Sequence, residues 1–252
     1  MTEPHPRRLE FEGAINFRDL GGYPAAGGRR TRWRRLFRAD SLADLTTDDL
    51  RVLADLGLRG LVDFRTDFER TLKPNRLPKG AAIRTLELGF LPAGTLQMLA
   101  EVRSGIIGVP ELERRVAEQY RKFAVEHIAQ YRQAIAFACA AENYPLLIHC
   151  MSGKDRTGFA AAVLLLAVGV PIEVVMEDYQ LTNQYRRDVS HLFGPKTPDD
   201  VVALLLSAQT RYLSAALEEI DRVHGSFEIY LTQALGVDDE KRERLVGLLT
   251  EG

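Results

Sequence analysis

The chain has 252 residues, which is enough for one large α/β domain with a substantial core. Its hydrophobic content of 46%, its charged content of 27% and its net charge of -2 are ordinary for a globular protein and argue against a nucleic-acid-binding protein. The first residues have no apolar core of a signal peptide, and the most apolar run, residues 159–170, is too short to cross a bilayer. We therefore expect a cytoplasmic protein, or one secreted without a signal peptide, with no transmembrane segment.

The first third of the chain predicts short strands and one helix. Paired glycines and alternating segments indicate a hairpin with strands near residues 15–17 and 33–38. Thr46 or Thr47 is the N-cap of a predicted helix that stops at Gly57. Two further strands are then predicted in the segments GLVDFR and AIRTLEL.

The rest of the chain predicts mainly helices. A long helical pattern over residues 110–141 has a break near residues 125–128, and the segment PLLIHC follows as a strand. Residues 157–167 form the next predicted helix, and Pro171 starts another. Later breaks are expected near Gly194, Gly225 and Gly236. With no repeat and no long linker, the pattern favours one α/β domain with a helix-rich C-terminal half.

The segment HCMSGKDRTG, residues 149–158, places reactive side chains between a predicted strand and a predicted helix. A tight loop that enters a helix presents successive backbone N–H groups and the positive end of the helix dipole, and such a loop binds phosphate. Gly153 lets the backbone approach an anion closely, and Arg156 supplies a fork of donors for two oxygens. The same positive field favours the thiolate of Cys150, which makes this cysteine a candidate nucleophile.

We predict that the whole loop binds phosphate, through residues Met151, Ser152, Gly153, Lys154, Asp155 and Arg156. Thr157 or Ser152 is expected to hydrogen-bond the sulfur and improve it as a leaving group. His149 is expected to order the loop from the end of the strand. No metal or cofactor is expected, because the cationic side chains and the helix terminus already supply positive charge.

Other kinds of site fit the loop less well. A nucleotide P-loop needs a glycine where Ile148 stands and a serine or threonine where Asp155 stands. Zinc binding by His149 and Cys150 lacks a second ligand pair at a usable spacing. The other cysteine, Cys139, is expected to be a small core residue.

The loop resembles the signature of the cysteine-dependent tyrosine phosphatases, and more closely that of the bacterial protein-tyrosine phosphatase B family, with its pattern HCxxGKDRTG. Segments similar to that family occur in the same order elsewhere, from about residue 15 to 249: NFRDLGG, RLFRADSL, LVDFRTDFER, EDYQLTN and GSFEIYL. The resemblance implies one phosphatase domain over residues 1–252, with a central, mostly parallel sheet and helices on both faces. It also implies hydrolysis of phosphate monoesters, usually phosphotyrosine, with phosphoserine, phosphothreonine and phosphoinositides accepted by some members.

The general acid is not where many relatives have it. Ordinary tyrosine phosphatases carry it in a Trp-Pro-Asp motif, but the single Trp33 is followed by two arginines. Some members of the resembled family have an aspartate after the strand where this chain has only Glu87, inside the strand. Asp155 is therefore the predicted acid, with a structural brace as the alternative role, and Asp63 is the reserve candidate.

Asn16, Arg18 and Asp19 crowd together before a Gly-Gly turn. The family resemblance suggests that they border the phosphate pocket. The alternative is that they hydrogen-bond the turn and pack it onto the sheet.

Two features suggest a polyanionic substrate. Lys154 adds a second cation beside Arg156, and six arginines lie within residues 29–38. This arginine segment is interpreted either as a solvated hairpin or as a surface for an anionic membrane. The predicted partner is a phosphotyrosine protein or a phosphoinositide. The competing functions are a phosphate-reading module without turnover and a rhodanese-type sulfurtransferase.

Overall fold

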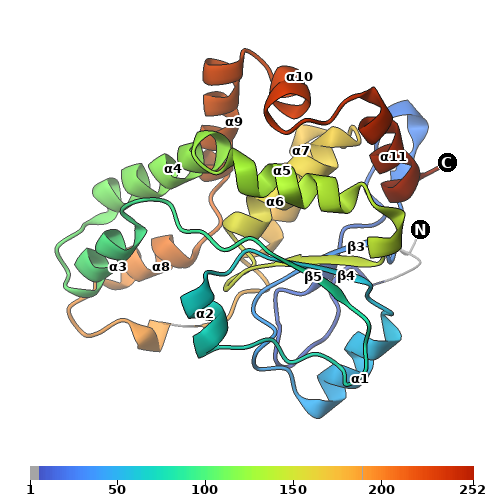
Figure 1. The fold of residues 1–252 in the computed structure, drawn as a ribbon. Helices are drawn as coiled ribbons and strands as arrows, with labels where there is room; N and C mark the ends of the chain where they lie inside the picture. Colours follow the sequence, from blue (N-terminus) through green and yellow to red (C-terminus); the bar gives the residue numbers. More distant parts are fainter. Residues whose placement is uncertain (1–5, 189) are drawn as a thin grey trace.

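The computed structural model describes residues 6–188 and 190–252. A five-stranded sheet lies at its centre (Figure 1). In spatial order its strands are β1 (Arg18–Asp19), β3 (Leu36–Ala39), β6 (Leu146–His149), β4 (Gly60–Asp63) and β5 (Arg84–Glu87). The last four are parallel, and β1 runs antiparallel to β3. The predicted α/β class and mostly parallel sheet are confirmed.

The strands form because short apolar runs can be buried on both faces of the sheet. Leu61 and Leu147 join the core beneath one face, whereas Val62 and Ile148 join the core beneath the other, as the alternation of side chains along a strand requires. The register places the last residues of β3, β4 and β6 side by side. The loop after β6 therefore begins at the carboxyl edge of the sheet, where open α/β sheets bind ligands.

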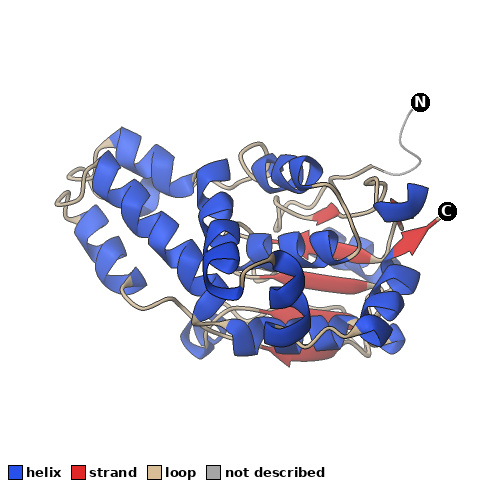
Figure 2. Ribbon diagram, turned by 90° about the horizontal axis from the view of Figure 1, so that it is seen from above, coloured by secondary structure: helices blue, strands red, loops and turns tan. Residues whose placement is uncertain are grey.

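Helices cover both faces unequally. One face carries α1 (Thr47–Asp55), and most of the others lie on the opposite face or extend past one end of the sheet (Figure 2). The remaining helices are α2 (Asp67–Leu72), α3 (Thr95–Arg103), α4 (Val109–Val125), α5 (Ile128–Ala138), α6 (Arg156–Ala167), α7 (Ile172–Leu181), α8 (Asp199–Leu206), α9 (Thr210–His224), α10 (Phe227–Ile229) and α11 (Asp239–Leu249). A small second sheet pairs β2 (Arg30–Thr31) with β7 (Thr250–Glu251) and so ties the end of the chain to its first third. None of the described helices is long and apolar enough to cross a membrane.

Several sequence predictions are confirmed. Thr46 caps α1 with a reciprocal capping box, and Gly57 has a positive φ of 63° just after the helix. The long helical pattern is divided into α4 and α5 at the predicted break, and β4, β5 and β6 lie where expected. Pro171 is the N-cap of α7, one position before the expected helix start.

Other predictions need correction. Residues 15–17 form no strand, because this segment turns and β1 begins only at Arg18. Residues 33–35 likewise form a turn before β3. The helices α2 and α3 were not predicted; both are short, and few of their residues are buried.

Candidate active site

The loop between β6 and α6 begins at a buried position and ends on a helix. His149 closes β6, and Cys150 follows with only 1% of its surface exposed. Arg156 is the first residue of α6, whose twelve residues direct the positive end of their dipole at the loop. The loop thus surrounds the thiol with the kind of field that an anion prefers.

The carbonyl groups of the loop are bound from outside it. His149 O accepts from Phe64 N, Met151 O from Ser41 N, Ser152 O from Asn16 Nδ2 and Gly153 O from Arg38 Nη2, over 3.0, 3.0, 2.9 and 2.7 Å. In a trans peptide the N–H points away from the C=O, so the amides that follow these carbonyls point inward. Within the described ranges, the N–H groups of Ser152 and Gly153 meet no acceptor. The loop is therefore a cradle of free donors for an anion.

Gly153 is required by the shape of this cradle. Its φ of +65° lies in the left-handed region, and a Cβ at this position would come within 2.5 Å of Ala39 O. Only glycine meets both conditions without strain. The loop can thus pack directly against the end of β3.

Arg156 is held by one edge and free along the other. Its Nη1 and Nη2 donate to the two carboxylate oxygens of Glu69 in α2, each over 2.8 Å, and Nη1 also donates to the carbonyls of Phe64 and Phe90. Its Nε makes no hydrogen bond in the described part of the chain. The Nε and Nη2 edge therefore remains available for two phosphate oxygens.

The pair of Glu69 and Arg156 stays ionised. Burial alone would raise the pKa of Glu69, but the hydrogen bonds and charge of Arg156 outweigh it and lower the pKa below its usual value. Burial would lower the pKa of Arg156, and Glu69 together with the nearby Cys150 raises it instead. Glu69 was not identified from the sequence, although the segment TDFE carries the capping-box signal that places this glutamate at the start of α2.

The three N-terminal candidates have different positions. Asn16 binds the loop directly at Ser152 O, whereas Arg18 lies behind it and donates to Asn16 Oδ1 over 2.5 Å. Asp19 accepts from the amides of Gly21 and Arg34 and so holds the turn. Among the described residues, Asn16 thus binds the loop, Arg18 supports Asn16, and Asp19 binds the turn, as in its alternative role.

A buried charge cluster supports the loop from behind. Asp178 of α7 accepts from Arg18 Nε over 2.9 Å and from Arg38 Nη1 over 2.6 Å. Burial alone would raise the pKa of Asp178, but the two arginines hold it well below its usual range. Arg38 connects this cluster to the loop, because its Nη2 also donates to Gly153 O. Neither Arg38 nor Asp178 was singled out from the sequence, because their partners lie more than a hundred residues away.

Asp63 and His149 form a second buried group beneath the loop. Asp63 is fully buried, and its carboxylate accepts from Arg65 and lies 3.3 Å from His149 Nε2. Burial would raise the pKa of Asp63, yet His149 and Arg65 lower it far below the usual range. Both of its oxygens already accept hydrogen bonds, from Arg65 and Asn75, which favours a structural role for Asp63 over its reserve role as the acid.

The carboxylate of Asp155 accepts a hydrogen bond from α4, and the charge of Arg156 lies near it. Tyr120 of α4 donates to Oδ1 of Asp155 over 2.8 Å, and the side chain of Asp155 remains 34% exposed. Thr157 Oγ1 is buried and has no partner among the described residues. Ser152 is exposed, and its hydroxyl accepts weakly from the Lys154 amide. Thr157 is therefore the better placed of the two candidates for the sulfur.

Lys154 does not present its ammonium to the pocket as a second free cation. Nζ donates to Leu205 O over 2.5 Å and to Ser207 O over 3.2 Å, at the carboxyl end of α8. This corrects the expectation drawn from its place in the loop. The side chain joins the loop to α8, and it also lies 3.5 Å from Asp155 Oδ1.

The arginine-rich segment also lies elsewhere than a pocket mouth. β3 begins at Leu36 opposite Leu146, so the residues before it lie at the amino edge of the sheet, opposite the loop. Some of their guanidinium groups bind the end of the chain: Arg32 Nε donates to Thr250 O and Arg35 Nε donates to Leu248 O. Of the six arginines, Arg38 alone contacts the loop.

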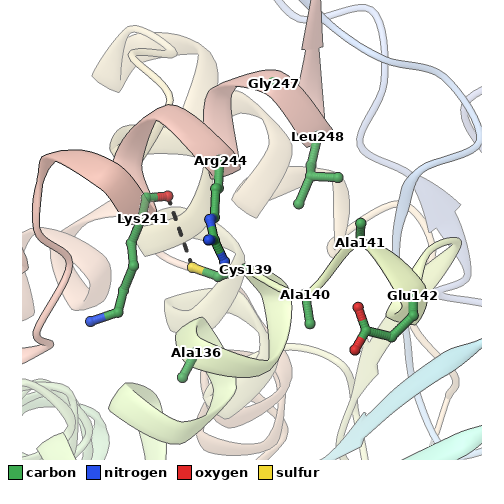
Figure 3. A pocket seen from close by; sticks show the side chains of 9 residues that line it. All are labelled: Ala136, Cys139, Ala140, Ala141, Glu142, Lys241, Arg244, Gly247 and Leu248. Atoms are coloured by element: carbon green, nitrogen blue, oxygen red, sulfur yellow. Dashed lines mark hydrogen bonds between the residues drawn. The ribbon is translucent and has the colours of Figure 1, made fainter.

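A surface pocket of about 640 Å³ lies near this amino edge, between α5 and α11 (Figure 3). Cys139 forms part of its wall as a mostly buried thiol 3.9 Å from Lys241 O. The two cations of the wall are already paired, Lys241 with Asp238 and Arg244 with Glu240. Residues 136–142 of the pocket wall come before β6, whereas Cys150 comes directly after β6. The pocket is therefore at the other end of this strand and separate from the phosphate cradle.

The chain is similar to known phosphatases along most of its length. A model described as the tyrosine phosphatase family matches residues 9–251. A Cupriavidus necator protein named as a tyrosine-protein phosphatase is 34% identical over 237 residues, which cover 91% of this chain and 85% of that protein. The triple specificity protein phosphatase PtpB of Mycobacterium tuberculosis is 29% identical over 275 residues, with 95% and 98% covered. The alignment with a solved structure of P. aeruginosa TpbA covers 75% of this chain and 89% of that one, at 19% identity and a TM-score of 0.36.

Proposed function

This chain belongs to the tyrosine phosphatase family and is a phosphatase, and we propose that it hydrolyses phosphate monoesters through a phosphocysteine formed on Cys150. The observation that carries the proposal is the cradle itself, in which inward amides and the free edge of Arg156 surround a buried thiol. We further propose that residues 1–252 act as one catalytic unit.

In the first step, the sulfur of Cys150 attacks phosphorus, and the bond to the leaving oxygen breaks. Arg156 and the loop amides hold the three equatorial oxygens, which is a task of positioning and charge stabilisation. Asp155 gives its proton to the leaving oxygen. In the second step, Asp155 takes a proton from water as the water displaces the sulfur and releases phosphate.

Phosphotyrosine is the proposed principal substrate, because the family acts on it. The name of PtpB gives that relative three specificities, and we propose that this chain also accepts phosphoserine or phosphothreonine. Hydrolysis of phosphoinositides stays a prediction with weaker support, since the ammonium of Lys154 is bound to α8 and the arginine segment lies at the far edge. The cytoplasmic, or signal-less secreted, location also stays a prediction.

A matched substrate panel tests the proposal. The parent and Cys150→Ser are each assayed on phosphotyrosine, phosphoserine and phosphothreonine peptides and on phosphoinositides. We expect turnover of phosphotyrosine by the parent and none by the variant, while oxyanion binding by the variant remains. A single burst of product without turnover would favour a phosphate-reading module. Transfer of sulfur from thiosulfate in place of hydrolysis would favour a sulfurtransferase.

A further inference from the structure

Four buried tyrosines from four helices surround the carboxylate of Asp155. Burial raises the pKa of each phenol, and the negative charge of Asp155 adds to this; the four come from α4, α5, α7 and α9 and are Tyr120, Tyr131, Tyr179 and Tyr212. Two cations also face it from the loop and from α6, namely Lys154 and Arg156. Of the four phenols, only Tyr120 hydrogen-bonds the carboxylate directly.

The hydroxyls form a chain with one direction. Tyr120 Oη lies 2.8 Å from Asp155 Oδ1 and 2.5 Å from Tyr179 Oη. A phenol has one proton, so when Tyr120 donates to the carboxylate it must accept from Tyr179. Burial raises the pKa of Tyr120 well above its usual value, and the charge of Asp155 adds to this, so the phenol keeps the proton that it donates.

The two carboxylate oxygens of Asp155 are therefore not equivalent. Oδ1 accepts from Tyr120 and has the ammonium of Lys154 at 3.5 Å. Oδ2 makes no hydrogen bond within residues 6–188 and 190–252, on a side chain that is partly open to solvent. An acid that must give its proton to a substrate needs that proton on the unoccupied oxygen.

We infer that Tyr120, held by Tyr179, is a positioning residue that occupies Oδ1 of Asp155 and so keeps the transferable proton on Oδ2. The inference rests on the proposed role of Asp155 as general acid. As the S–P bond forms and the bond to the leaving oxygen breaks, the proton moves from Oδ2 to that oxygen. The carboxylate left behind is stabilised by the donor already in place. Oδ2 then takes the proton of the water that displaces the sulfur.

Removal of the donor should change catalysis in a specific way. Without Tyr120 the carboxylate product is less stabilised, so the acid holds its proton to higher pH and gives it up less readily. In Tyr120→Phe, the alkaline limb of kcat/KM is expected to move up by about one pH unit, the effect of one charge-assisted hydrogen bond. On the plateau below that limb, kcat/KM should fall about ten-fold for phenyl phosphate and only about two-fold for p-nitrophenyl phosphate, which needs less help from an acid.

The experiment compares full pH profiles of both substrates for the parent and three tyrosine variants. Tyr179→Phe keeps Tyr120 in place and removes only the donor behind it, so it should shift the limb in the same direction by a smaller amount. It carries the test if Tyr120→Phe fails to fold. Tyr230→Phe is the matched control, because this buried hydroxyl has no partner among the described residues. The inference would be overturned if Tyr120→Phe and Tyr179→Phe matched Tyr230→Phe both in the pH of the alkaline limb and in the ratio of kcat/KM for the two substrates.

Asp155→Asn, assayed in parallel, tests the acid role of Asp155 separately from the positioning role of Tyr120. Selective loss on phenyl phosphate in Asp155→Asn, with no effect of the phenol variants, would remove only the role of Tyr120. Equal loss on both substrates in Asp155→Asn would remove the acid role of Asp155 and the inference with it.

Discussion

Glu69 is the residue outside the loop on which the orientation of Arg156 most depends. Its carboxylate accepts two hydrogen bonds of 2.8 Å from the guanidinium, and the side chains of Glu69 and Arg156 are only 18% and 9% exposed. In Glu69→Ala, Arg156 becomes a buried cation without its counterion. We therefore expect both the stability and the activity of the protein to fall.

The size of this effect follows from the burial and the contacts of the pair. Loss of one partner of a buried ion pair costs roughly 3–5 kcal/mol. We expect about 3 kcal/mol of unfolding free energy, at the lower end of that range, since Arg156 keeps the carbonyls of Phe64 and Phe90 as acceptors. Glu69→Gln keeps an oxygen acceptor and should lose about 1.5 kcal/mol. The free edge of Arg156 is no longer held towards the phosphate, so kcat/KM should fall about 100-fold in Glu69→Ala.

Urea unfolding and steady-state kinetics with a phosphotyrosine peptide measure the two effects. Glu87→Gln is the matched control, since Glu87 is 55% exposed and lies 3.3 Å from Arg70 in a surface pair. Such a pair contributes about 0.5 kcal/mol or less. If Glu69→Ala unfolds and turns over like Glu87→Gln, the bidentate contact does not orient Arg156 and the account of this side chain is wrong.

Three further predictions concern the support of the loop. Gly153→Ala should lower the free energy of unfolding by about 2 kcal/mol or more and remove most of the activity, because the new Cβ is strained by the left-handed φ and also meets Ala39 O. In the control Gly80→Ala, which has open space around it, only the strain of the positive φ should appear, at about 1 kcal/mol. Equal losses in the two variants would argue against the close packing of Gly153. Lys154→Met should speed hydrogen exchange in α8 and reduce phosphotyrosine and phosphoinositide hydrolysis to a similar extent; a loss confined to phosphoinositides would restore Lys154 as a substrate-binding cation. Arg18 and Arg38 lower the pKa of Asp178 in the folded protein. Ionised Asp178 therefore contributes its full share to the free energy of unfolding above about pH 4, and this share is lost as the pH falls towards the folded pKa, at up to about 1.4 kcal/mol per pH unit. Acid unfolding of Asp178→Asn should lack this slope, and an unchanged slope would refute the assignment.

The loop could be predicted from sequence because its residues are contiguous. A strand, six residues and a helix fix the cradle locally, so Cys150, Gly153 and Arg156 could be assigned before any tertiary contact was known. α1, with its capping box, and the long helical pattern of α4 and α5 were predicted for the same reason. β1 was placed three residues too early because it is two residues long, and its pairing with β3 rather than its composition defines it.

The supporting side chains could not be found in this way. Glu69, Tyr120 and Asp178 reach the loop and its arginines from α2, α4 and α7, and in the sequence each is an ordinary residue of a helix. Lys154 was interpreted as a free cation because the position of α8 was unknown. The two interpretations of the arginine-rich segment stayed open for a related reason, since only the parallel register of β3 and β6 shows at which edge of the sheet it lies.

In the proposed reaction the phosphoryl group passes through the sulfur of Cys150. Rapid acid quenching of the parent with a labelled phosphotyrosine peptide, followed by digestion and mass spectrometry, tests it directly. We predict transient label on the peptide that contains Cys150, released with the chemistry of a thiophosphate, and no label in Cys150→Ser. Label on His149 or on another residue, or full turnover by Cys150→Ser, would contradict the account.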